Sequence, residues 1–86
     1  MEYVYIYNSI WENGRKFEGG VVSRAFKEKD DAVKAMKLEE NQVVDMLANY
    51  YDKNEIAKFH GGLSIEIATN DYEDCWAGSI EKLKIE

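Results

Sequence analysis

The chain has 86 residues, in which 11 lysines and arginines face 17 aspartates and glutamates, so the formal net charge is −6. This length fits one domain, residues 1–86, with one modest core. Cys75 and His60 are the only cysteine and the only histidine, which excludes an internal disulfide and a zinc finger. We expect a fold that needs no disulfide, no metal and no cofactor.

The first residues of the chain and its apolar runs indicate where in the cell the protein is expected. Residues Met1–Val4 lack the basic start of a signal peptide. The longest apolar run, Tyr3–Tyr7, is far shorter than a membrane span. A lone thiol is typical of a reducing compartment. We therefore expect a soluble cytoplasmic protein that does not bind membranes.

The first predicted element is a β-hairpin. Residues 3–11 are rich in aromatic and β-branched side chains, and Asn13-Gly14, the preferred centre of a two-residue turn, follows them. A turn there pairs Ile6 with Val21, and alternation then sorts the side chains onto two faces. The face expected to join the core carries Val4, Ile6 and Ile10. The opposite face, called here the tyrosine face, carries Tyr3, Tyr5, Tyr7 and Trp11.

A helical period follows from Lys29, where Asp30 or Asp31 is suited to the positive end of a helix. The polar run 39–42 predicts a break or kink near Asn41, with one long helix as the alternative. Residues 52–59 are expected to add a final helical turn. The apolar residues expected on one helical face are Ala32, Met36, Val43, Leu47 and Tyr50 or Tyr51.

The last third of the chain predicts two strands. Leu63, Ile65 and Ile67 alternate with other residues, Asn70-Asp71 indicates a turn, and a final strand runs through Cys75-Trp76 to Ile80 or beyond. The order β-β-α-β-β predicts an α+β fold, a four-stranded, mostly antiparallel sheet with one long or broken helix on one face. A single helical layer covers one sheet face, so we expect the tyrosine face to be uncovered.

Catalytic groups are scarce. A nucleophile needs a base within reach, and His60 is the only imidazole. We expect His60 to be a surface or capping residue, and Cys75, in a predicted strand, to be a small buried hydrophobe. Gly19-Gly20 precedes a strand and not a helix, so it does not form a phosphate-binding loop. The protein is expected not to be an enzyme.

Acidic residues gather in the C-terminal third, where residues 61–86 hold six acids and two bases. Asp71, Glu73 and Asp74 share one predicted turn, and Glu66 lies nearby. A solvated loop is one interpretation. The other is a partner-binding site, because carboxylates on a hairpin tip fit an arginine- or lysine-lined groove that otherwise holds phosphate.

The tyrosine face is the second candidate site, since exposed aromatic rings supply desolvated contact area for a partner. A homodimer through this face, or coverage by the chain's own termini, is the alternative. Direct binding to nucleic acid is not expected, because phosphate binding draws its affinity from an excess of positive charge and this chain has a net charge of −6.

Four segments form a loose pattern that resembles small uncharacterised domains of bacteria and their phages: Val4–Ile6, Gly20–Ser23, Phe26–Ala32 and Trp76–Gly78. In size and acidity the chain is also similar to phage-encoded inhibitors, anti-CRISPR proteins among them. That resemblance implies a protein of the host-cell cytoplasm that acts by binding, in some cases as a nucleic-acid mimic.

These observations predict a small acidic binding protein that occupies a basic, nucleic-acid-binding surface of a partner protein such as a nuclease. The residues expected to bind the partner are Asp71, Glu73, Asp74, Glu66, Tyr3, Tyr5, Tyr7 and Trp11. The alternative is a small-molecule or nucleotide-binding module, a sequestering dimer in one version. The residues expected to hold the anion in that case are Arg15, Lys16, Arg24 and His60.

Overall fold

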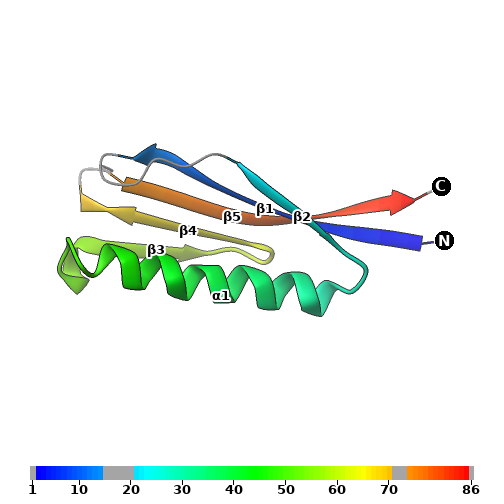
Figure 1. Ribbon diagram of the computed structural model, residues 1–86, viewed down its shortest axis with the longest axis horizontal. Helices are drawn as coiled ribbons and strands as arrows, with labels where there is room; N and C mark the ends of the chain where they lie inside the picture. Colours follow the sequence, from blue (N-terminus) through cyan, green and yellow to red (C-terminus); the bar gives the residue numbers. More distant parts are fainter. Residues whose placement is uncertain (1, 15–20, 71–73, 86) are drawn as a thin grey trace.

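The computed structural model describes residues 2–14, 21–70 and 74–85. One helix lies against a five-stranded antiparallel sheet with the strand order β2-β1-β5-β4-β3 (Figure 1). The α+β class, the helix on one face and the antiparallel sheet are confirmed, and the strand number is five instead of four. The elements are β1 (Glu2–Gly14), β2 (Val22–Phe26), α1 (Lys29–Leu47), the 3-10 turn η1 (Lys53–Glu55), β3 (Ile56–His60), β4 (Ser64–Thr69) and β5 (Asp74–Ile85).

The additional strand is β3, which takes up the second part of the segment 52–59, while a helical turn forms only in its first part, at Lys53–Glu55. After α1 ends, Asp52 and Glu55 form a capping box around η1, a single 3-10 turn. The chain then becomes extended and pairs with β4. The Gly61 N–H donates to the Ser64 carbonyl, 2.8 Å away, and closes the connection between these two strands.

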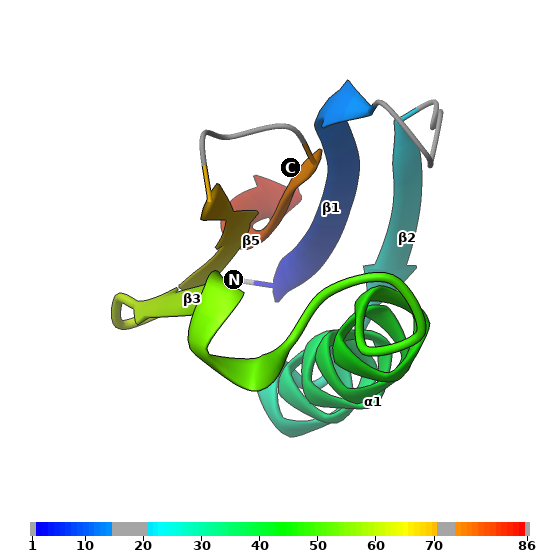
Figure 2. The same cartoon turned by 90° about the vertical axis from the view of Figure 1, so that its left-hand side faces the viewer.

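Helix α1 is continuous from Lys29 to Leu47, so the break predicted near Asn41 is wrong. The polar run 39–42 does not interrupt the helix because two of its carboxylates face protein partners. Glu39 accepts a hydrogen bond from Tyr7 of β1, and Glu40 contacts His60 of β3. Figure 2 shows α1 lying along one side of the curved sheet.

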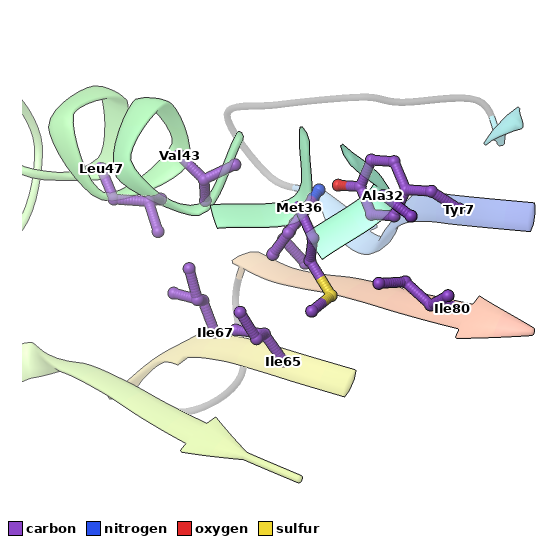
Figure 3. Packing of buried hydrophobic residues seen from close by; sticks show 9 residues of the cluster. Tyr7, Ala32, Met36, Val43, Leu47, Ile65, Ile67 and Ile80 are labelled. Atoms are coloured by element: carbon purple, nitrogen blue, oxygen red, sulfur yellow. The ribbon is translucent and has the colours of Figure 1, made fainter. Parts of the chain in front are cut away.

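The core lies between α1 and the sheet (Figure 3). The predicted apolar face of the helix is confirmed for Ala32, Met36, Val43 and Leu47, which are all buried. Its predicted continuation to Tyr50 or Tyr51 is wrong, because α1 ends at Leu47. The sheet contributes the other side of this cluster. Its buried members there are Tyr7, Ile65, Ile67, Trp76 and Ile80.

The pairing of β1 with β2 differs from the predicted hairpin. Ile6 pairs with Ala25 and not with Val21, a displacement of four residues. Asn13 and Gly14 pair with β5, so they are not the turn. Residues 15–20 lie outside the described part of the chain. Because the displacement is an even number of residues, it does not move any side chain to the other face of the hairpin. The residues predicted to share one face of β1 and β2 therefore still share one face.

The assignment of the two faces is reversed. The tyrosine face lies under α1, and Tyr7 is only 2% exposed. The face predicted to be the core, with Val4, Ile6 and Ile10, lies on the opposite side of the sheet. The long tyrosine ring reaches the helix and brings its hydroxyl to Glu39, which makes it a better core residue at this position than its polarity indicates.

Among the described residues, no helix combines the length and the apolar character needed to span a membrane.

Candidate partner-binding surface

The tyrosine face does not form an exposed surface. Tyr7 is buried and donates its hydroxyl hydrogen to Glu39, and burial, followed by the hydrogen bond and the charge of Glu39, raises the pKa of Tyr7 well above its usual range. Tyr5 and Trp11 are partly buried and pack against the core. Only Tyr3, at the start of β1, is substantially exposed, at 39%. The prediction of four uncovered rings is therefore wrong.

One carboxylate of the predicted acidic turn, that of Asp74, is buried and does not belong to an exposed surface. Asp74 is fully buried at the start of β5. Its Oδ2 accepts a hydrogen bond from the Tyr51 hydroxyl, 2.5 Å away, and its N–H donates to Thr69 Oγ1 at 3.1 Å. Asp71 and Glu73 lie outside the described residues. Of the four acids singled out from the sequence, Glu66 is the one described as exposed.

The surface that the helix leaves open is the other face of the sheet, called here the open face. The register and the alternation of strand residues place apolar side chains on it from all five strands. Phe59, Leu83 and Ile85 are each about half exposed, and Ala68 and Cys75 are buried at one end. The large apolar side chains of the open face are Val4, Ile6, Ile10, Phe59, Leu83 and Ile85.

Charge is divided between the two faces. Three exposed acids of the described strands lie on the open face, namely Glu2, Glu66 and Glu81. The register places no strand lysine or arginine there. The lysines and arginines of the described strands all lie on the side of α1, as does His60; they are Arg24, Lys58, Lys82 and Lys84.

Two of these cations are held by rings on the α1 side. Lys82 Nζ lies 4.0 Å from the centre of the Tyr3 ring, and the Arg24 guanidinium lies 5.1 Å from that of Phe26. The open face is thus apolar and acidic, with the strand cations directed away from it.

The structure does not bring together the two described residues of the alternative anion site, Arg24 and His60. Arg24 is on β2 and His60 is on β3, the two edges of the sheet, and three strands lie between them. Four strand spacings amount to about 19 Å along the sheet, too far for one small anion. His60 also contacts Glu40, with Nε2 2.6 Å from Oε2. Arg15 and Lys16 lie outside the described residues.

The two residues considered for nucleophilic chemistry lie far apart in the sheet. Cys75 is buried in β5, as expected for a small hydrophobe. His60 is on the surface at the end of edge strand β3, and its partner is a carboxylate. No helix ends beside His60, contrary to the prediction, because the histidine is the last residue of strand β3.

No family model, no curated protein and no solved structure matches the chain. The resemblance to small bacterial and phage domains therefore stays a prediction.

Proposed function

We propose that this protein binds another protein through its open face and occupies a cation-rich surface there, as an inhibitor of a nucleic-acid-handling protein would. The division of charge between the two faces carries this proposal. Glu2, Glu66 and Glu81 supply negative charge, and the apolar residues among them supply contact area that is desolvated on binding.

The same charges indicate a partner that is a different protein. A symmetric dimer through the open face would bring two sets of three carboxylates together with no strand cation on either side. Like charges facing each other at short range oppose such an interface. A surface rich in lysine and arginine, of the kind that binds phosphate, is attracted to the same carboxylates and associates faster with them at low salt.

The test reverses charge on the open face and, as a control, elsewhere. The face variant is Glu66→Lys/Glu81→Lys. The control, Asp31→Lys/Asp45→Lys, changes the net charge equally at two exposed positions of α1. Both variants and the wild type are immobilised, exposed to native extract, and washed with increasing salt or with heparin, a polyanion that competes for cationic surfaces. Retained proteins are identified by mass spectrometry and purified for affinity measurement.

We expect the wild type and the control to retain a protein that heparin displaces, and the face variant to bind that purified protein at least tenfold more weakly. Circular dichroism verifies that all three chains are folded. Equal binding by the face variant and the control, or a partner that heparin and salt leave in place, would contradict the proposal.

A further inference from the structure

The side of the sheet that α1 covers has a cavity that the proposed function does not use. The edge strand β2 and the helix α1 lie side by side there (Figure 2). Between them is a cavity of about 230 Å³. Sites for drug-sized ligands measure roughly 300–1,000 Å³, so this cavity fits a smaller molecule.

Three apolar side chains line the cavity. Val22 of β2 is 49% exposed and Leu38 of α1 is 62% exposed, and Ala35 lies one helical turn before Leu38. Their exposed apolar area is removed from water when an apolar group enters, which favours binding. The lining therefore suits a ligand with an aliphatic portion.

Two opposite charges line the same cavity, Arg24 of β2 and Glu39 of α1. Both act on the hydroxyl of Tyr7, which also lines it. The pKa of Tyr7, raised mainly by burial, is raised further by Glu39 and lowered by the charge of Arg24. Within the described ranges of the chain, Arg24 and Glu39 form no ion pair with each other. The cavity thus offers a cation and an anion that do not neutralise one another.

Each of these charges keeps capacity for a ligand. The Tyr7 hydroxyl donates to Oε1 of Glu39, and a carboxylate accepts further hydrogen bonds at its second oxygen. The Arg24 guanidinium lies 5.1 Å from the centre of the Phe26 ring, and its five N–H donors are more than that contact uses. Gln42, one turn after Glu39, adds an amide that both donates and accepts.

A ligand with a single charge does not suit this pair. An anion beside Arg24 is close to the Glu39 carboxylate, and a cation beside Glu39 is close to the Arg24 guanidinium, so each is repelled by the second group. A small ligand that carries both charges avoids these repulsions. It also makes a charge-assisted hydrogen bond with each group, and such bonds are stronger than neutral ones.

We propose that the cavity between β2 and α1 binds a free α-amino acid with an aliphatic side chain. Arg24 donates to its carboxylate, Glu39 accepts from its ammonium group, and Val22 and Leu38 contact its side chain. The residues that line this site belong to α1 or to the α1 side of β1 and β2. The site is therefore separate from the open face, and it does not rest on the proposed function.

The probe is L-leucine at millimolar concentration, added to the isotope-labelled full chain while backbone amide shifts are followed by NMR. Three analogues separate the contributions of its groups. Isocaproate lacks the ammonium group, and isoamylamine lacks the carboxylate. The third, ε-aminocaproate, is an isomer of leucine that carries the two charges at opposite ends of an unbranched chain.

The cavity variants are Arg24→Met and Glu39→Gln, each of which removes one charge and keeps a side chain of similar size. The amide introduced by Glu39→Gln still has an oxygen that accepts the Tyr7 hydrogen bond. The controls are Lys58→Met, at a strand cation on the same side of the sheet but the opposite edge, and Asp45→Asn, at an exposed acid of α1. Neither control residue is among those that line the cavity.

We expect leucine to shift the amides of residues 22–24 and 35–42. Loss of either charge, in the ligand or in the protein, should weaken binding at least tenfold, because each loss removes one hydrogen bond between charged groups. The isomer ε-aminocaproate should bind at least tenfold more weakly than leucine, and the two control variants should change the affinity less than twofold.

Absence of these shifts with leucine, isoleucine and valine at millimolar concentration would overturn the inference. Isocaproate or ε-aminocaproate binding as tightly as leucine would also overturn it, because the site would then recognise an anion or the two charges alone. The analogue series uses the wild-type chain, so it decides the question even where a variant does not fold. Leucine binding that Glu66→Lys/Glu81→Lys abolishes would move the ligand to the open face and contradict the site proposed here.

Discussion

His60 Nε2 lies 2.6 Å from Glu40 Oε2, and this contact joins the end of edge strand β3 to the middle of α1. The two side chains differ in environment, since that of Glu40 is 12% exposed and that of His60 is 53% exposed. In the described residues, β3 pairs with β4 alone. The contact therefore ties an edge strand, whose backbone pairs with one strand only in the described residues, to the helix that covers this face of the sheet.

Removing this histidine is expected to loosen β3. His60→Ala leaves a nearly buried carboxylate without that partner, which costs about 1–3 kcal/mol of unfolding free energy. Lys58→Ala, at an exposed residue of the same strand and face, is the control and should cost less than about 0.5 kcal/mol. Urea unfolding gives the free energies, and hydrogen exchange shows whether amides 56–60 open first. Equal costs for the two variants would contradict the role of the contact.

Tyr7 is expected to make stability fall at alkaline pH. Its pKa is raised by burial and by Glu39 above the ordinary value near 10, so the unfolded chain loses this proton before the folded chain does. The contribution is fully present below pH 10 and declines by about 1.4 kcal/mol per pH unit above it. Urea unfolding at pH 8, 10 and 11 should show this decline in the wild type and a shallower one in Tyr7→Phe. The same slope in both chains would assign the decline to other groups.

The sequence pattern correctly predicts the elements in which apolar residues recur at a single spacing, either helical or alternating. Ala32, Met36, Val43 and Leu47 repeat at helical spacing, and Ile65 and Ile67 alternate, and all are buried as expected. The strand at 56–60 was missed because its central residues are exposed and carry no contrast between two faces. The helix break was predicted from polarity alone, and the sheet residues that bind Glu39 and Glu40 are distant in sequence.

The sequence predicts that the single helix leaves one face of the sheet uncovered, but the uncovered face is not the one predicted. One helix does leave one side of the sheet open, but a tyrosine has both a large ring and a hydroxyl, and it is suited to either side. Ile6 and Tyr7 are neighbours in sequence, and their relative polarity favoured the isoleucine as the core residue. The decision depends on Glu39, which accepts the Tyr7 hydrogen bond from across the core. No local pattern contains that contact.

Gly78 is expected to be required for the packing of the core. A methyl group on its Cα would lie 2.8 Å from a ring carbon of Trp76 and 3.2 Å from one of Tyr7, both buried. Gly78→Ala should therefore cost about 1–3 kcal/mol, because neither ring has room to move. Gly62→Ala is the matched control, since nothing lies within 4 Å of the added atom there. Thermal and urea unfolding of both variants test this, and a stable Gly78→Ala chain would show that the rings rearrange.

Asp74 is expected to support the fold and not to bind a partner. It is fully buried and accepts a hydrogen bond from Tyr51, so Asp74→Ala should lower the unfolding free energy by about 1–3 kcal/mol. Glu66→Ala, which removes an exposed carboxylate, should change it by less than about 0.5 kcal/mol. Association rates with the partner, measured below the melting temperature of each variant, should be affected in the opposite order. Glu66→Ala should associate more slowly than the wild type, and Asp74→Ala should associate at the wild-type rate. A stable Asp74→Ala chain that associates slowly would return Asp74 to the binding surface.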